Sequence, residues 1–161
     1  MNADKLRDVW SRFPTGVTLI STLDTEGKAH SMTANSVCSV SLDPPLALVC
    51  VGRSRQSHGH IKEKGKFSIS ILNRRQESLA RYFSQDPALR KGQVAPEYAF
   101  NDDGTPVLKE CHAYLACYLE SQLDAGTHTV FIGRITEVAI RKKRGGPLVF
   151  YKSKYTSLRD S

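Results

Sequence analysis

The stretches CHAYLACYLE (111–120) and HTVFIGRITEVAI (128–140) decide the fold class of this chain. Apolar residues recur at alternate positions along both stretches, and a short turn around Asp124-Ala125-Gly126 separates them. Successive side chains of a β-strand point to opposite faces of a sheet, so this pattern predicts two long strands joined in an antiparallel hairpin.

Further strands are predicted on both sides of this hairpin. They are VTLISTL (17–23), AHSMTANSVCSVSL (29–42, a strand pair with a break), LALVCV (46–51), FSISIL (67–72) and PLVFY (147–151). The turn signal DTEGK (24–28) makes the first two a hairpin, and Asp43-Pro44-Pro45 ends the second. Because 46–51 is apolar at every position, we expect that strand to be buried on both faces and to be the best core candidate.

Three short helices are predicted. Leu6, Val9, Trp10 and Phe13 share one helical face, and we expect this first helix, ended by Pro14, to cover a sheet. A second helix is expected after Gly52, capped by Ser54 and ended by Gly65. The third spans 76–84, with Leu79, Tyr82 and Phe83 on one face. A surface loop is expected from there to Pro106, and a polar tail after 151.

Six or seven strands with two or three short helices predict a mainly β fold, a closed or nearly closed antiparallel barrel, because regular strand–helix alternation is missing. The chain has 161 residues, 40% of them hydrophobic and 24% charged. This length and composition predict one domain over 1–161.

The formal net charge of +7 and a pI near 9.4 allow nucleic acid, an anionic membrane surface or a phosphate-bearing ligand as partner. Residues 1–13 carry charge throughout, and no stretch approaches the roughly eighteen apolar residues of a membrane span. We therefore expect a cytoplasmic protein that does not enter a membrane, with its four cysteines reduced.

The absence of several motifs weighs against other functions. The sequence has no G-x-G-x-x-G after a strand, no G-x-S-x-G and no H-E-x-x-H, so Rossmann, hydrolase and zincin functions are disfavoured. The pair His58-x-His60 has no evident third ligand, and we expect no metal site. The basic run RKKR (141–144) lacks interleaved aromatic residues, so we expect a solvated turn and no nucleic-acid partner.

Three segments are candidates for a ligand site. The turn GRSRQSH (52–58) could hold an anion with its hydroxyls, guanidiniums and a helix N-terminus, or it could be a solvated, capped turn. The segment MTANSV (32–37) leaves room for a flat ligand, or forms a kink between strands. His128 could donate a proton or contact a dinucleotide, or be an ordinary turn residue. The residues alone leave these alternatives open.

Taken together, five motifs resemble the short-chain flavin reductase-like family, which includes the reductase components of two-component flavin monooxygenases. They are FPTGVT (13–18), MTANS (32–36), SVSLDPPL (39–46), GRSRQS (52–57) and HTVFIGRI (128–135), in order within residues 7 to 155. The resemblance implies an FMN-binding split β-barrel that forms a homodimer, with the flavin in a groove near the subunit interface and NAD(P)H against its exposed ring.

The resemblance also implies roles for single residues. The isoalloxazine would lie along Thr33, Ala34, Asn35 and Ser36, and its ring or ribityl chain would lie beside Val51 and Gly52. The flavin phosphate would be bound by Ser54, Arg55, Ser57 and Arg81. The nicotinamide side would be formed by Tyr155 and by His128, which is the catalytic candidate. The sequence departs from the family pattern at Val37, which is often aromatic in relatives, and in the tail SKY (153–155), which matches only loosely.

The function implied is hydride transfer from NADH or NADPH to FMN, or to FAD, with reduced flavin passed to a partner monooxygenase or another acceptor. Because the cofactors carry the chemistry, no acid–base pair needs to stand out in the sequence. Two alternatives remain: a flavin-binding barrel without turnover, and a basic nucleic-acid-binding barrel.

Overall fold

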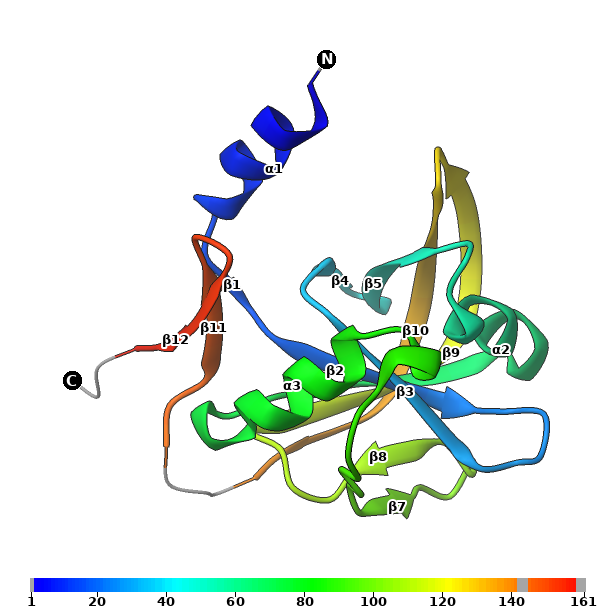
Figure 1. The fold of residues 1–161 in the computed structure, drawn as a ribbon. Helices are drawn as coiled ribbons and strands as arrows, with labels where there is room; N and C mark the ends of the chain where they lie inside the picture. Colours follow the sequence, from blue (N-terminus) through cyan, green and yellow to red (C-terminus); the bar gives the residue numbers. More distant parts are fainter. Residues whose placement is uncertain (1, 142–144, 159–161) are drawn as a thin grey trace.

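The computed structural model describes residues 2–141 and 145–158, and its centre is a seven-stranded sheet with the order β3-β2-β6-β9-β10-β5-β4. All neighbouring strands are antiparallel, and the sheet curls into an open barrel (Figure 1). Its strands are β2 (Thr18–Leu23), β3 (Ala29–Ala34), β4 (Val37–Leu42), β5 (Pro45–Gly52), β6 (Lys66–Ile71), β9 (Ala113–Ala125) and β10 (His128–Ile140). The mainly β class predicted from the sequence is confirmed.

Two smaller sheets lie beside the barrel. One joins β1 (Thr15–Gly16), β11 (Leu148–Tyr151) and β12 (Lys154–Ser157), and the other pairs β7 (Tyr98–Phe100) with β8 (Pro106–Leu108). The expected surface loop before Pro106 was therefore wrong in part, because it contains β7 and the short 3-10 helix η2 (Pro87–Leu89). The segment after 151 is polar and mostly exposed, as expected, but it is not only a tail, because β12 pairs with β11.

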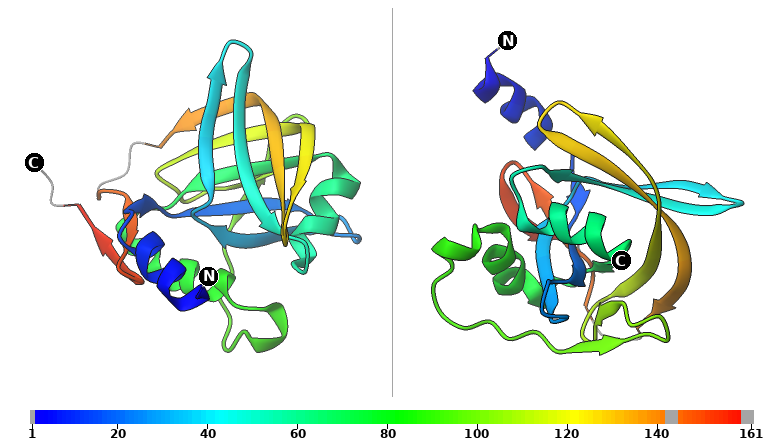
Figure 2. Two further views of the ribbon diagram at one scale, coloured as in Figure 1. Left: turned by 90° about the horizontal axis from the view of Figure 1, so that it is seen from above. Right: turned by 90° about the vertical axis from the view of Figure 1, so that its right-hand side faces the viewer.

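The hairpin of β9 and β10 connects the two halves of the barrel. Both strands have 13 residues, and Gly126 turns the chain between them with φ +59°. The start of β9 pairs with β6, while the start of β10 pairs with β5. Register shifts at Ile132/Gly133 and Ile135/Glu137 bend the strands, as β-bulges do. The predicted long hairpin is confirmed, and its two strands curve around the barrel (Figure 2).

Strand β6 separates two hydrophobic cores. Phe67 and Ile69 pack inside the barrel with Phe131, whereas Leu72, just after the strand, packs in a second cluster on the opposite side. The serine side chains of β6 are buried as well, and Ser68 Oγ donates to the carbonyl of Pro106 at 2.6 Å. Alternate side chains of 67–72 therefore point into two different cores, here called the inner core, inside the barrel, and the outer core, on the opposite face of β6.

Helix α2 (Gln56–Lys64) covers the inner core with Ile61, and Gly65 ends it in the left-handed conformation at φ +62°, as predicted. The prediction that Ser54 caps this helix was wrong. The capping position is Arg55, whose backbone is extended and whose side chain makes no capping hydrogen bond among the described residues.

Helix α3 (Glu77–Ser84) follows the short 3-10 helix η1 (Arg74–Gln76) and packs on the outer core with Leu79, Ala80 and Phe83. The predicted helix is confirmed. The Thr33 hydroxyl donates to the carbonyl of Ala80 at 2.8 Å and so joins the end of β3 to this helix.

Helix α1 (Ala3–Ser11) forms as predicted, but the expectation that it covers a sheet of its own chain was wrong. It projects from the barrel, and none of its residues is buried (Figures 1 and 2). Trp10 is 65% exposed, and Phe13, just beyond the helix, is 63% exposed. The expectation failed because an apolar helical face does not indicate which surface covers it, and no described part of this chain covers α1.

The expectation that 46–51 is buried on both faces was wrong as well. Ala47, Val49 and Val51 are buried, but Leu46, Leu48 and Cys50 on the other face of β5 are only half-buried. Of the basic run 141–144, residues 142–144 lie outside the described part of the chain. Within the described residues, no helix has the length and apolar character needed to cross a membrane.

Candidate functional site

A pocket of about 380 Å³, here called the polar pocket, lies where β3 and β5 end and β10 begins. Strand pairing brings these ends together, because Gly52 at the end of β5 lies opposite His128 at the start of β10. Most of the residues singled out in the sequence line this pocket: Thr33, Ala34, Asn35, Ser36, Gly52, Ser54, Arg55 and His128. The structure therefore brings together three segments that are far apart in the chain.

Gly52 lies between His128 and Arg55 in this pocket. A Cβ atom at Gly52 would lie 3.6 Å from His128 Nε2 and 3.7 Å from Arg55 Cγ. The missing side chain leaves the strand backbone open between the His128 imidazole and the aliphatic part of the Arg55 side chain. A flat or phosphate-bearing ligand can approach the main chain there.

Arg55 precedes the first turn of α2, and its Nη2 donates to the carbonyl of Ser84 at 3.3 Å. The first turn of α2 contains no acidic residue, so the partial positive charge of the helix N-terminus is uncompensated there. Together, the guanidinium and the helix end form a favourable environment for an anion.

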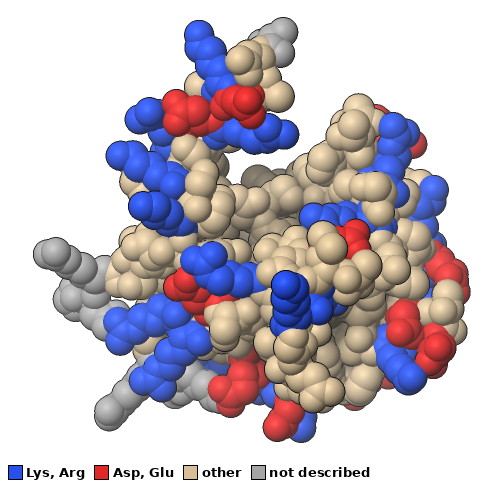
Figure 3. Space-filling model, viewed as in Figure 1, with Lys and Arg blue, Asp and Glu red and all other residues tan. Residues whose placement is uncertain are grey.

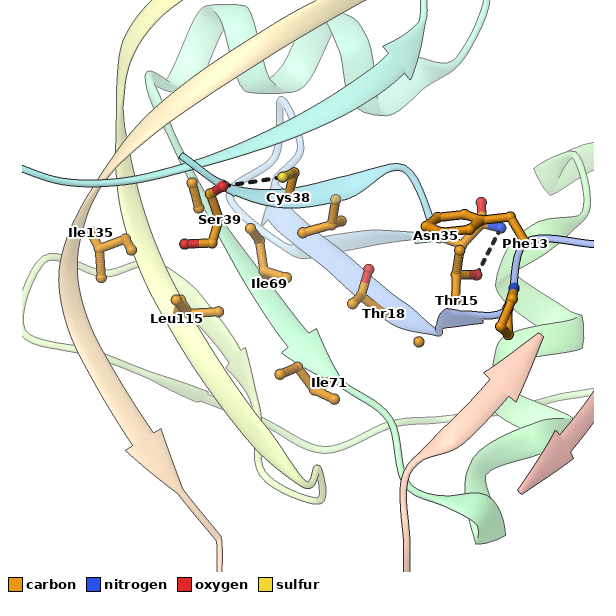
Figure 4. Close-up of a pocket in the computed structure, with 14 residues that line it drawn as sticks. Phe13, Thr15, Thr18, Asn35, Cys38, Ser39, Ile69, Ile71, Leu115 and Ile135 are labelled. Carbon is orange, nitrogen blue, oxygen red and sulfur yellow. Dashed lines mark hydrogen bonds between the residues drawn. The ribbon is translucent and has the colours of Figure 1, made fainter. Parts of the chain in front are cut away.

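Asn35 lies at the junction of three pockets. It lines the polar pocket, a smaller pocket of about 170 Å³ with Phe150 and Tyr155, and a largely apolar pocket of about 450 Å³. Figure 4 shows the apolar pocket, with Asn35 beside Phe13 and its Nδ2 donating to Thr15 Oγ1 at 3.2 Å. One amide therefore borders all three spaces.

The smaller pocket, here called the aromatic pocket, is lined by Tyr155, and Arg81 of α3 lies against the Tyr155 ring. The Tyr155 ring lies 5.2 Å from that of Phe150, and the Arg81 guanidinium lies 4.8 Å above the Tyr155 ring. Arg81 also pairs with Glu77 at 2.7 Å. Thr33, Ala34 and Asn35 line both the aromatic and the polar pocket, so the two are adjacent along the end of β3.

Four predicted residues do not line the polar pocket: Arg81 and Tyr155, described above, and Val51 and Ser57. The Val51 side chain is fully buried in the inner core, since side chains alternate along β5 and Gly52 has the pocket-facing position. Ser57 is 2% exposed, and its Oγ lies 2.9 Å from His30 Nε2. The hydroxyl of Ser57 thus has a partner within the protein.

The histidines near α2 have different environments. Burial, with the neighbouring charges of His60 and Arg90, lowers the pKa of His30 to about 4, so its imidazole is neutral at neutral pH. His58 bonds to Thr129, while the His60 ring packs against His30 at 4.8 Å. His58 and His60 therefore do not converge on one point, and the described residues contain no cluster of three or more metal-ligating side chains.

Positive charge also lies outside the polar pocket. Figure 3 shows Lys and Arg side chains gathered over α1 and along the left-hand side of the molecule in that view. A surface potential of this sign raises the local concentration of anionic ligands.

Sequence analysis missed several residues of the site. Cys50 and Thr127 line the polar pocket, and Ser84 and Phe150 line the aromatic one. Thr127 follows a predicted turn and directly precedes His128, so its position in the sequence already indicated that it lies near the site. Ser84 and Phe150 reach the site only through tertiary packing, which no local pattern indicates.

The fold and the pockets define a class, a small antiparallel β-barrel with a polar pocket at its open edge. The model of the flavin reductase like domain matches residues 10–159. The chain belongs to this flavin reductase-like family.

Relatives and solved structures agree with this assignment. The chain is 35% identical over 156 residues to the flavin-dependent monooxygenase reductase subunit HsaB of Rhodococcus jostii, covering 96% of this chain and 77% of that protein. It is 36% identical to a probable flavin reductase of Rhizobium meliloti over 81% of this chain, but it spans only 42% of that protein's length.

Among solved structures, flavin reductase PheA2 has a TM-score of 0.90 and 34% identity, covering 99% of this chain and 100% of that one. The NADH:FAD oxidoreductase SgcE6 of Streptomyces globisporus, in complex with NAD and FAD fragments, has a TM-score of 0.87 and 29% identity over 98% of this chain and 93% of that one. The similarity therefore extends through the whole barrel.

Proposed function

We propose that this chain is an NADH-dependent flavin reductase, an NAD(P)H:flavin oxidoreductase that reduces a flavin for a partner monooxygenase. The observation that carries the proposal is the polar pocket, where Arg55, at the N-terminus of α2, and His128 lie on either side of Gly52. Membership of the flavin reductase-like family supports it, as do HsaB and SgcE6, whose names describe a monooxygenase reductase subunit and an NADH:FAD oxidoreductase.

We propose FMN as the preferred flavin and FAD as a second substrate. Two features of the described residues support a flavin mononucleotide. Ser54 and Arg55 provide donors for one phosphate, and the exposed backbone at Gly52 allows a planar ring to approach. When bound, the flavin itself supplies the hydride-accepting chemistry.

The protein then has to bind the flavin and the nicotinamide nucleotide, orient them and shield them from water. Thr33 to Ser36 would lie along the ring, with the Asn35 amide available to its polar edge. His128, at the far side of Gly52 from Arg55, would border the nicotinamide and serve as the catalytic residue. Tyr155, with Arg81 above its ring, would contact the nicotinamide nucleotide from the adjacent aromatic pocket.

Flavin-dependent oxidation of NADH tests this function directly. We expect the near-ultraviolet absorbance of NADH to fall when FMN and protein are both present, at a rate proportional to the protein concentration. Protein without added flavin, and flavin without protein, are the controls. Flavin that binds without NADH oxidation would instead favour a non-catalytic binder, and a protein that binds no flavin would contradict the proposal.

We also propose that the chain forms a homodimer through the surface that includes α1 and the apolar pocket. Val9, Trp10 and Phe13 are each about 60% exposed, and Phe13 also lines the apolar pocket. Soluble monomers rarely leave such continuous apolar surface in water. A second copy would bury both the helix face and the pocket.

Replacing Trp10 with aspartate should weaken the dimer by about 30-fold or more, because central aromatic residues often contribute about 2 kcal/mol or more to an interface. Sedimentation at several concentrations measures the change. Asp8→Ala is the matched control, because Asp8 lies on the opposite, polar side of α1 and pairs with Arg12. If the unaltered protein sediments as a single chain at micromolar concentration, the dimer proposal is wrong.

We place the protein in the cytoplasm. All four cysteines are free thiols in the structure, which is usual in a reducing compartment.

A further inference from the structure

Thr129 lies at the centre of a chain of hydrogen bonds that runs from the half-buried His58 to the exposed Asp124, beside the polar pocket. It is fully buried and directly follows His128 in β10. Its hydroxyl donates to Asp124 Oδ1 at 2.6 Å and lies 2.9 Å from His58 Nε2. Thr129 therefore links the end of β9 to the first turn of α2.

The direction of this chain follows from the chemistry of its members. The hydrogen bond from Thr129 lowers the pKa of Asp124, so Asp124 is a carboxylate at neutral pH and can only accept. A hydroxyl has one proton, and Thr129 gives it to Asp124. Hence Thr129 Oγ1 must accept from His58, which fixes the His58 tautomer with its proton on Nε2.

His58 is held in this arrangement from its other side. Its ring centroid lies 5.3 Å from that of the fully buried Phe131. Burial and the positive charges of Lys62 and Arg53 lower the pKa of His58, although the carboxylate of Asp124 opposes this effect. A neutral imidazole with a single N–H donor fits the direction of the chain.

This chain connects the two sides of the polar pocket. His58 lies three residues after Arg55, whereas Thr129 is the next residue after His128. Backbone hydrogen bonds already hold β10 to β5 and β9, so the strands do not need the Thr129 hydroxyl. The N-cap side chain of helix α2 makes no capping bond among the described residues, and its first turn is held to the sheet by two side-chain contacts, Ser57 to His30 and His58 to Thr129. Of these two, only the contact to Thr129 reaches the strand that carries His128.

We propose that Thr129 is a positioning residue that, through His58 and Asp124, holds the Arg55 side of the polar pocket at a fixed distance from the His128 side. The consequence for catalysis rests on the proposed flavin reductase function. Spacing matters for binding, because a bound phosphate is held best when the guanidinium and the helix end both lie within hydrogen-bond distance of it.

Thr129→Val tests this role, since valine keeps the shape of threonine but removes both hydrogen bonds. We expect the KM and Kd for FMN to rise about tenfold, a change of about 1.4 kcal/mol, with kcat changed less than about threefold. Thr129→Ser keeps the hydroxyl and should restore most of the affinity. Thr22→Val is the matched control, because Thr22 is a buried strand threonine whose hydroxyl donates to the Lys66 carbonyl, away from the pocket.

Amide hydrogen exchange without ligand gives a second readout that does not depend on activity. Exchange should become faster at residues 55–59 in Thr129→Val but not in Thr22→Val, since only the former releases the first turn of α2. Unchanged FMN affinity together with unchanged exchange at 55–59 would overturn the proposal. If the unaltered protein fails to reduce flavin, the function fails, while the exchange data still decide the role of Thr129.

A second variant covers the case in which Thr129→Val does not fold. His58→Phe keeps a ring against Phe131 but removes the Nε2 donor. It should give the same rise in KM for FMN and the same faster exchange in α2. Normal KM and normal exchange in this variant would contradict the positioning role.

Discussion

Arg55→Ala should weaken FMN binding by about 10- to 100-fold, because hydrogen bonds to charged groups contribute about 1.5–3 kcal/mol each. Arg55 lines the polar pocket beside the N-terminus of α2, where a phosphate would meet both a guanidinium and backbone N–H groups. Titration of flavin fluorescence with the protein measures the affinity. Riboflavin, which lacks the phosphate, should bind the variant and the unaltered protein equally well.

Arg53→Ala is the control for this prediction, since it removes the same charge two residues away. The Arg53 guanidinium donates to the carbonyl of Gly126 and is not among the residues that line the polar pocket. A long-range charge effect would weaken FMN binding similarly in both variants and would fall with added salt. Equal losses for FMN and riboflavin in Arg55→Ala would place the phosphate elsewhere.

The parts of the fold that could be predicted are those determined by local pattern. Alternation along 111–120 and 128–140 predicts the long hairpin, and Gly65 predicts the end of α2, because strand and helix periods and left-handed caps are properties of neighbouring residues. The exposure of Trp10 and Leu46 could not be predicted in this way. It depends on which surface lies opposite them, and such surfaces come from distant segments or from another molecule.

The candidate site shows the same division. The residues alone allowed segment 32–37 to be a kink between strands and segment 52–58 to be a solvated, capped turn. The family resemblance favoured a ligand site at both. Strand pairing then places Asn35, Gly52 and His128 around one pocket. The chain from His58 to Thr129 was out of reach, because its members are 71 positions apart and only the paired strands reveal the contact.

Gly133→Ala should lower the free energy of unfolding by about 1–3 kcal/mol, the usual penalty for overpacking a core. A Cβ atom at Gly133 would lie 2.7 Å from both Cys117 Cβ and Phe67 Cζ. Both neighbours are buried, and the β10 backbone is fixed on both edges by β5 and β9. Denaturant unfolding measures the loss, and thermal unfolding should shift by about 2–4 °C for each kcal/mol.

Gly59→Ala is the control, because a Cβ atom there meets nothing within 4 Å and Gly59 lies inside α2. That variant should gain about 0.4–1 kcal/mol, since alanine restricts the unfolded chain. A double-mutant cycle with Phe67→Leu, which removes the Cζ contact, identifies the cause. If overlap with the ring destabilises Gly133→Ala, the double variant will lose less stability than the sum of the two single losses. Full additivity would instead attribute the loss to the contact with Cys117 Cβ or to the backbone of the bulge at Ile132/Gly133.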